Sequence, residues 1–398
     1  MQMAKVLGMM GDFAVAEAAK LCNPDVVAAF PITPQTIIVE RLSEFVADGE
    51  LDCEYITVES EHSAMFACYG AASTGARVYT ATASQGVALM CEILYLVASA
   101  RFPVVMTVVN RALSGPISIW CDHNDAMLAR DSGWIQLFVE DCQEAYDSTI
   151  QAFRVGEDKR VSLPVMVSLD GFILSHSIEP VSIIEPTDKK TIDGFLPRRD
   201  PLYRLDVDAP IAVGTCAFPE YYMDIKKAQN EAMRNSKNVI KEVVEEFGDR
   251  WGRYYPIVES YQMDDAEVAL VTMGSFTGTA KTTVDEMREE GERVGLVKLR
   301  CFRPFPIEEM RIALRDVQAC GVVDRAVSFG SFGPSYAETA GSLSGREEPL
   351  LRNFIAGLGG RDVTVADFKK MYDILYDDLK KGDLIEQPIT WYGIRKEE

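Results

Sequence analysis

Four short stretches in the first third of the chain place polar residues where they could do chemistry. FPITP puts Thr33 directly before Pro34, and SEHSA puts Glu61 ahead of a run of small residues. TASQG contains Ser84, and an apolar run ends at Arg111. A helix start attracts anions, a carboxylate can exchange a proton, and a guanidinium binds a carboxylate through two parallel hydrogen bonds. These residue types predict a site that binds an anion.

Each stretch also has an ordinary structural interpretation. Thr33 is a good N-cap and Pro34 suits the first helical position, so FPITP predicts a helix that begins there. Ser84 is interpreted as a second helix cap. An acidic residue such as Glu61 is common in the first turn of a helix. The residues alone leave both interpretations open.

The segment after Arg111 contains the cluster Asp122-His123-Asn124-Asp125. This cluster could hold a metal ion, but one histidine and two aspartates are a weak signal, and helix capping is the better interpretation. The nine cysteines form no C-x-x-C pair, and there are only three histidines, so no zinc site or iron–sulfur cluster is expected within this chain. We therefore assign no metal ligand. No G-x-G-x-x-G follows the first strand, and no P-loop or G-x-S-x-G elbow is present.

Short apolar runs alternate with helical patterns through the first 180 residues, and this alternation predicts a mostly parallel, doubly wound α/β sheet. The predicted strands are Asp25–Phe30, Glu54–Val58, Arg77–Thr82, Pro103–Asn110, Trp134–Val139 and Pro164–Leu169. The predicted helices are Phe13–Leu21, Pro34–Val46, Glu61–Ser73, Gly86–Ala100 and Gln143–Val155. Because the segment 86–100 is apolar nearly all round, we expect it to be a buried helix.

The rest of the chain changes character after residue 180. Residues 180–215 contain five prolines and predict an irregular connection, and 220–250 predict one or two charged helices. The stretches AEVALVTMGS, GLVKLRCFRPFP and GVVDRAVSFGSFG predict strands of a smaller α/β domain, and ADFKKMYDILYDDLKK predicts an amphipathic helix with a loose terminus. We expect a first domain over 1–255, a second over 256–365, and a C-terminal helix and tail over 366–398.

Composition narrows the class of protein. The chain has 398 residues, of which 47% are hydrophobic, enough for a large core. No apolar run reaches the roughly 18 residues of a membrane span, and the N-terminus does not read as a signal peptide, so we expect a cytoplasmic protein. The net charge of −21 and the absence of a basic patch argue against nucleic-acid binding.

Taken together, FPITP, SEHSA, TASQG and NRALSGPISIW resemble the alpha subunit of 2-oxoacid:ferredoxin oxidoreductases, most closely the pyruvate (pyruvate synthase) type. LDGFILSH, VALVTMGSFTGTAK and FIAGLGGRDVT extend the resemblance over essentially the whole chain. It implies a sheet of the thiamine-diphosphate, pyrimidine-binding type and a smaller domain that is similar to the transketolase C-terminal domain.

The resemblance also implies roles for individual residues. Glu61 would contact N1′ of the pyrimidine, and Ser84 and Gln85 would bind the cofactor. A carboxylate at N1′ favours the tautomer whose 4′ nitrogen can take the proton from the thiazolium ring. Thr33 would lie against the substrate, and Arg111 would bind its carboxylate.

The same resemblance implies cofactors and partners. Thiamine diphosphate would be shared with a beta subunit, and Mg²⁺ and [4Fe-4S] clusters would belong to partner subunits. Gamma- and delta-type subunits and ferredoxin would be further partners, with coenzyme A as co-substrate. The products would be acyl-CoA and CO₂.

Alternatives remain on sequence alone. A single arginine suits a monocarboxylate such as pyruvate, but branched-chain, aromatic, 2-oxoglutarate and oxalate substrates stay open. A ferredoxin-independent thiamine enzyme shares the same domain type, and a scaffold subunit without catalysis is a third possibility. The presence of Glu61, Thr33 and Arg111 together argues against a scaffold.

Overall fold

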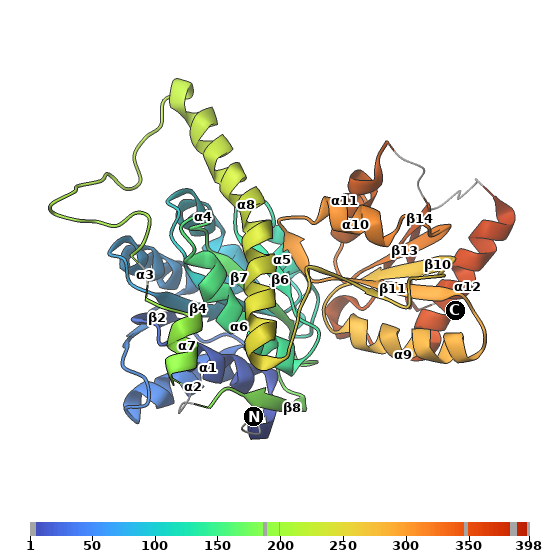
Figure 1. Cartoon of the computed structure of the whole chain (residues 1–398), viewed down its shortest axis with the longest axis horizontal. Coiled ribbons are helices and arrows are strands. Elements are labelled where there is room, and N and C mark those ends of the chain that lie inside the picture. Colours follow the sequence, from blue (N-terminus) through green and yellow to red (C-terminus); the bar gives the residue numbers. More distant parts are fainter. Residues whose placement is uncertain (1–4, 186–188, 199, 346–348, 383–387, 396–398) are drawn as a thin grey trace.

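The chain folds around two large β-sheets that lie side by side, and a small two-stranded sheet accompanies them (Figure 1). The structure is a computed structural model that describes residues 5–185, 189–198, 200–345, 349–382 and 388–395. No helix in these ranges is both long and apolar enough to cross a bilayer.

The first sheet has seven strands in the order β12-β6-β7-β5-β4-β2-β3. Its parallel strands are β2 (Val26–Ala29), β3 (Glu54–Thr57), β4 (Val78–Thr82), β5 (Val105–Asn110), β6 (Ile135–Phe138) and β7 (Val165–Asp170). All six lie within or next to the predicted apolar runs, so the predicted doubly wound parallel sheet is confirmed. β12 (Cys301–Arg303) joins it antiparallel, at the edge of β6.

Helices cover both faces of this sheet. They are α1 (Gly11–Cys22), α2 (Thr36–Ala47), α3 (Glu61–Ser73), α4 (Gln85–Ser99), α5 (Asn124–Leu128) and α6 (Cys142–Gly156). Apolar residues of α1, α2 and α6 share one core, and those of α3 and α4 share another. The prediction that α4 is buried is wrong, because Leu89 is 48% and Tyr95 40% exposed. Its apolar surface is wider than the single face that the sheet can cover.

The stretch between the sheets contains more regular structure than predicted. β8 (Ile178–Ile183) pairs antiparallel with β1 (Lys5–Met10) in a separate two-stranded sheet. α7 (Lys189–Phe195) follows, and α8 (Pro219–Trp251) is one helix of 33 residues whose first half projects beyond the first sheet (Figure 1). The prolines that break the local pattern hid β8, which obtains its hydrogen bonds from a strand about 170 residues earlier.

The second sheet has six strands in the order β15-β14-β13-β10-β11-β9. Its strands are β9 (Val258–Tyr261), β10 (Val268–Thr272), β11 (Val294–Leu299), β13 (Ala319–Asp324), β14 (Leu350–Ile355) and β15 (Ile389–Trp391). Its helices are α9 (Phe276–Glu289), α10 (Ile307–Ala313), α11 (Pro334–Leu343), the 3₁₀ turn η2 (Leu358–Gly360) and α12 (Val365–Lys381).

Two predictions about this second half need correction. GLVKLRCFRPFP does not supply strands to the second sheet alone, because β11 belongs to that sheet and β12 returns to the first. The predicted amphipathic helix is confirmed as α12, but part of the terminus that was expected to be loose belongs to the fold. α12 packs Phe368 and Met371 into the core of the second sheet, and β15 pairs with β14. Contacts between segments far apart in the sequence decide both outcomes, and the local hydrophobic pattern does not reveal such contacts.

Candidate active site

The polar residues predicted from the sequence lie at the carboxyl edge of the first sheet. Thr33 follows β2, Ser84 follows β4, Arg111 follows β5, and Glu61 begins α3. The strand order reverses between β2 and β4, since β3 lies on one side of β2 and β4 on the other. Ligands of open α/β sheets bind at such a switch point. The structure therefore gathers these predicted residues where this fold binds ligands.

Thr33 lies in a turn rather than at a helix cap. α2 begins at Thr36, and Gln35 occupies the N-cap position without a side-chain capping bond. The buried Gln35 amide donates to Phe30 O at 2.9 Å and to Ala81 O at 3.0 Å, which holds this turn against the sheet before the helix starts. The predicted helix start at Thr33-Pro34 is therefore wrong, and the Thr33 side chain is left exposed.

Glu61 is a nearly buried carboxylate at the start of α3. Ser60 caps this helix by accepting a hydrogen bond from Ser63 N. Glu61 is 7% exposed, and within the described ranges no hydrogen bond or ion pair reaches its carboxylate. A Cβ on Gly86 would lie 3.0 Å from Glu61 Oε1, so glycine keeps a side chain away from it. An unpartnered buried carboxylate is costly, which points to a polar group supplied by a ligand.

Ser84 has an unusual backbone conformation, with φ of 48°. It occupies the N-cap position of α4, but its side chain makes no capping bond, so its predicted capping role is wrong. Its hydroxyl instead lies 2.6 Å from Ala112 O and 2.5 Å from Gln85 Oε1. A positive φ at a non-glycine residue costs about 1–3 kcal/mol and is often found at functional sites.

Asp125 connects two of these corners, and sequence reasoning missed this role. Its buried carboxylate accepts hydrogen bonds from Ser84 N, Arg111 N and Asn110 Nδ2, each at 2.9 Å. Burial raises the pKa of Asp125 to about 6, although these bonds act in the opposite direction. In the predicted capping cluster His123 occupies the N-cap position of α5 without a side-chain capping bond, while Asp122 accepts from Asn124 N and Asp125 accepts from Ala126 N in the first turn. The sequence did offer one signal for this role of Asp125, which is that an acidic residue follows soon after the strand that ends at this edge.

Arg111 is half-buried and partly fixed by backbone carbonyls. Its Nη1 donates to Thr33 O at 2.9 Å, and its Nε donates to Ser118 O at 3.2 Å. Nη2 has no partner in the part of the chain that the structure describes. The guanidinium is thus oriented next to Thr33 with donor capacity to spare, as a carboxylate site requires.

Comparison with known proteins identifies the family. Residues 17–245 match the family described as pyruvate flavodoxin/ferredoxin oxidoreductase, thiamine diphosphate-binding, and residues 266–368 match pyruvate:ferredoxin oxidoreductase core domain II. The chain belongs to the pyruvate:ferredoxin oxidoreductase family. This confirms the family that the four motifs predicted.

Curated relatives match the chain almost end to end. Pyruvate synthase subunit PorA of Pyrococcus horikoshii is 48% identical over 98% of both chains, and that of Thermotoga maritima is 49% identical over 98% of both. Ketoisovalerate oxidoreductase subunit VorA of Pyrococcus abyssi is 45% identical over 97% of both.

Solved structures share the fold at low identity. A 2-oxoglutarate:ferredoxin oxidoreductase from Magnetococcus marinus superimposes with a TM-score of 0.70 at 19% identity, covering 95% of this chain and 66% of that chain. A split-gene transketolase superimposes with a TM-score of 0.51 at 12% identity, covering 93% of this chain and 99% of that chain. The predicted combination of a pyrimidine-binding-type sheet and a transketolase-like second domain is confirmed as a fold.

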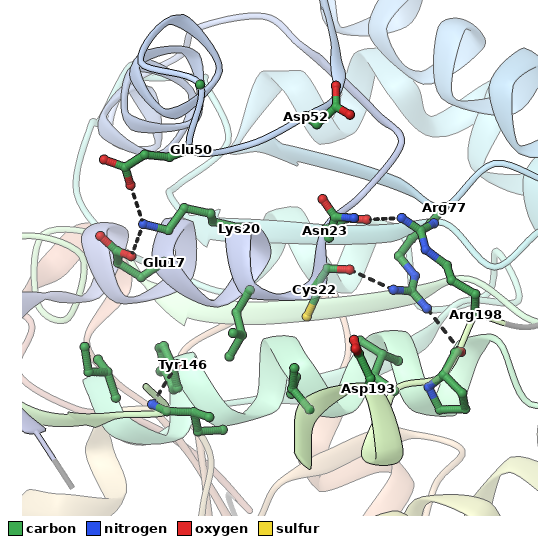
Figure 2. Close-up of a pocket in the computed structure, with 17 residues that line it drawn as sticks. Glu17, Lys20, Cys22, Asn23, Glu50, Asp52, Arg77, Tyr146, Asp193 and Arg198 are labelled. Carbon is green, nitrogen blue, oxygen red and sulfur yellow. Dashed lines mark hydrogen bonds and ion pairs between the residues drawn. The ribbon is translucent and has the colours of Figure 1, made fainter. Parts of the chain in front are cut away.

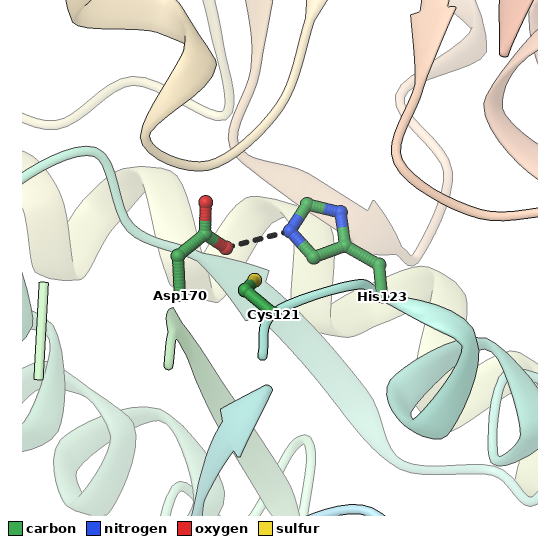
Figure 3. A group of neighbouring side chains, drawn as sticks. All are labelled: Cys121, His123 and Asp170. Carbon is green, nitrogen blue, oxygen red and sulfur yellow. Dashed lines mark hydrogen bonds and ion pairs between the residues drawn. The ribbon is translucent and has the colours of Figure 1, made fainter. Parts of the chain in front are cut away.

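Cys121, His123 and Asp170 form a second buried group near this edge (Figure 3). Their potential ligand atoms lie within 4.8 Å of one another. The guanidinium of Arg325, however, donates to Asp170 Oδ2 at 2.6 Å and lies 3.6 Å from Cys121 Sγ. Because a cation already neutralises this group, a metal ion is disfavoured here.

A cavity of about 1000 Å³ lies at the opposite edge of the sheet (Figure 2). Its lining residues Asn23, Asp52 and Arg77 precede β2, β3 and β4, which places it at the amino ends of the strands. Arg77 is paired with Glu157 at 2.5 Å, and Lys20 lies between two glutamates. Its size notwithstanding, this cavity lies away from Glu61 and Arg111, and the candidate active site does not include it.

Proposed function

We propose that the chain is the alpha-type subunit of a 2-oxoacid:ferredoxin oxidoreductase that works only in complex. It would convert a 2-oxoacid, pyruvate first, and coenzyme A into acyl-CoA and CO₂, with electrons passed to ferredoxin. The observation that carries this proposal is the unpartnered carboxylate of Glu61, close to Gly86, at the same carboxyl edge of the sheet as the Arg111 and Thr33 corner. The similarity to pyruvate synthase subunits supports pyruvate, and the similarity to VorA keeps a branched 2-oxoacid as the second candidate.

The residues at this edge suit thiamine diphosphate. The carboxylate of Glu61 matches a ring nitrogen that carries a proton, and the missing side chain of Gly86 keeps its surroundings open. Ser84 and Gln85 lie at the start of α4, where they would line the same cofactor. When bound, thiamine diphosphate supplies a carbon nucleophile and accepts the electron pair released by decarboxylation.

The side chains of this chain would divide the remaining work. Glu61 holds a proton at the cofactor's ring nitrogen, in a setting from which water is largely excluded. Arg111 binds the carboxylate of the 2-oxoacid and fixes its direction of approach. The exposed hydroxyl of Thr33 donates a hydrogen bond to a substrate oxygen next to Arg111.

Partner subunits would supply what this chain lacks. The sequence has no Gly-Asp-Gly…Asn stretch to hold Mg²⁺ and the diphosphate, and no clustered cysteines. We assign these functions, with the [4Fe-4S] clusters, to beta-, gamma- and delta-type subunits in a cytoplasmic complex. The exposed apolar side chains of Phe66 (42%), Leu89 (48%) and Tyr95 (40%) lie on α4 and on α3, the helix that Glu61 begins, and suit the beta subunit.

Reconstitution with its partner chains tests this proposal. The complex should reduce a viologen dye in a coenzyme-A-dependent reaction, and a screen of pyruvate, ketoisovalerate, 2-oxoglutarate and oxalate should identify the preferred substrate. The lone chain should contain no iron and bind thiamine diphosphate weakly. Activity with none of the 2-oxoacids, or stoichiometric iron in the lone chain, would contradict the proposal.

Replacement of Arg111 by lysine should raise KM for the 2-oxoacid about ten- to a hundredfold, with a smaller change in kcat. Lysine keeps the charge but loses the planar fork, and a hydrogen bond to a charged group contributes about 1.5–3 kcal/mol. Steady-state kinetics of the reconstituted complex measure both constants. An unchanged KM would rule out Arg111 as the carboxylate clamp.

Replacement of Thr33 by valine should lower kcat/KM roughly tenfold and leave the melting temperature nearly unchanged. The hydroxyl makes no capping bond, so its loss costs the fold little, while one lost bond to the substrate is worth about 1.4 kcal/mol or more. Thr33→Ser should recover most of the activity. Full activity of the valine variant would mean that this hydroxyl does not contact the substrate.

A further inference from the structure

A buried polar cluster joins the two sheets close to the candidate active site. It consists of Asp170, His123, Ser275 and Arg325, and we call it the Asp170 cluster. Asp170 ends β7 of the first sheet, whereas Ser275 follows β10 and Arg325 follows β13 of the second. The carboxyl ends of strands from both sheets therefore meet at this carboxylate.

Both oxygens of Asp170 are occupied. Oδ1 lies 2.6 Å from His123 Nε2, and Oδ2 accepts from Arg325 Nη1 at 2.6 Å, from Ser275 N at 3.1 Å and from Ser275 Oγ. Asp170 is 1% exposed, and burial alone would raise its pKa. Arg325 and His123 more than offset this effect and hold the pKa of Asp170 well below its usual value, so the carboxylate is ionised.

Gly274 permits this close contact between the sheets. Its φ is +69°, and a Cβ at this position would lie 3.0 Å from Asp170 Oδ1 and 3.2 Å from His123 Cε1. Any side chain here would push the second sheet away from Asp170. The tight approach is therefore part of the architecture of the cluster.

The cluster continues through α5 to the active-site corners. His123, a member of the cluster, occupies the N-cap position of α5. Its backbone N–H donates to Arg325 O at 2.8 Å. Two residues later, Asp125 accepts from Ser84 N and Arg111 N. The second sheet thus fixes one side of this short helix, and the helix fixes two corners of the site on its other side.

We propose that Asp170 is a positioning residue, which transmits the placement of the second sheet through His123 and α5 to Arg111 and Ser84. This inference rests on the proposed function, since it assigns Arg111 and Ser84 to that site. A metal ion is a poorer explanation of the cluster, because Arg325 already supplies its positive charge. A purely stabilising role is the alternative that the experiment must separate.

The test compares Asp170→Asn with Lys281→Met in the reconstituted complex. Asparagine keeps the shape of Asp170 but cannot accept from His123, Arg325 and Ser275 together. Lys281→Met is the matched control, because Lys281 of α9 also reaches the first half, where its Nζ lies 3.0 Å from Glu140. Its ion pairs within the described residues, with Glu140 and Glu259, do not involve α5. We expect Asp170→Asn to lower kcat/KM for the 2-oxoacid at least about tenfold, and Lys281→Met to change it less than about twofold.

Hydrogen exchange of the backbone gives a readout without turnover. Arg111 N, Ala112 N and His123 N are all hydrogen-bonded in the loop 111–123. These amides should exchange faster in Asp170→Asn than in Lys281→Met at matched melting temperature. Equal exchange and equal kcat/KM in the two variants would overturn the proposal.

Ser275→Ala keeps the test decisive if Asp170→Asn does not fold. It removes the hydroxyl's hydrogen bond to Asp170 and the one it accepts from Arg325, at a half-buried position, and it should lower kcat/KM about three- to tenfold, with recovery in Ser275→Thr. No loss in the alanine variant would contradict the role of the cluster. Inactivity of the unmodified complex with every 2-oxoacid would instead count against the proposed function, so the two failures are distinguishable.

Discussion

Replacement of Glu61 by glutamine should reduce turnover at least about a hundredfold while the chain folds and assembles normally. The amide keeps the size of the carboxylate but cannot serve as proton partner for a ring nitrogen, and a positioned general acid–base group contributes about 10²–10⁴-fold. No hydrogen bond within the described chain depends on the Glu61 carboxylate, so stability should change little. Coenzyme-A-dependent dye reduction and circular dichroism measure the two effects.

Glu59→Gln is the matched control for this experiment. Glu59 lies two residues earlier in the same corner, but it is exposed, and its Oε1 accepts from Ser63 Oγ. Its replacement should leave kcat within about twofold, because this exposed carboxylate is solvated, already accepts from Ser63, and has no proposed contact with the cofactor. Near-normal turnover in a folded Glu61→Gln variant would sink the assignment of Glu61.

Replacement of Glu144 by glutamine should destabilise the chain by about 3–5 kcal/mol, the usual cost of breaking a buried ion pair from one side. Glu144, in the first turn of α6, is 1% exposed and lies 2.7 Å from Lys298 Nζ and 2.9 Å from Arg300 Nε. Arg300 is fully buried and would keep its charge without a carboxylate partner. Urea unfolding of the purified chain measures the difference.

The pH dependence of this difference is a second check. Burial tends to raise the pKa of Glu144, but Lys298 and Arg300 together lower it below its ordinary value. The ion pair therefore stabilises the fold at neutral pH, and its contribution is lost only as the pH falls below about 4.3 and through the folded-state pKa. Wild type and variant should thus converge in acid.

Glu308→Gln provides the control for stability. Glu308 pairs with Lys237, but its side chain is 65% exposed, and such surface pairs contribute about 0–1 kcal/mol. If Glu144→Gln were no more destabilising than Glu308→Gln, the buried pair would contribute no more than a solvated one.

The first sheet was predictable because its strands are nearly continuous β-branched runs, buried on both faces between helices. β5 and β7 are examples, with every residue buried. The alternation of strands and helices also implies that the strands are parallel, so that their carboxyl ends share one edge. Thr33 and Arg111 could therefore be placed at that edge from the sequence. Their roles in catalysis are still predictions.

The errors share a physical cause, which is that contacts between distant residues overrode local preference. Thr33-Pro34 has every local feature of a helix start, yet the amide of Gln35 bonds to a neighbouring strand and delays the helix. Ser84 is a good cap by residue type, but its hydroxyl turns to Ala112. Asp170 directly follows a predicted strand, but nothing local indicates its cluster, because its partners Ser275 and Arg325 lie more than 100 residues away in sequence.

The return of β12 to the first sheet affects how the protein can be synthesised. The edge of β6 stays open until residue 303 has left the ribosome, long after β7 ends at residue 170. At about 5–20 residues per second, this interval lasts roughly 7–27 s. Throughout it, a nascent chain exposes an unpaired strand edge, and the carboxylate of Glu144 awaits Lys298 and Arg300. Translation speed and chaperone supply therefore bear on the yield of this subunit before any partner is bound.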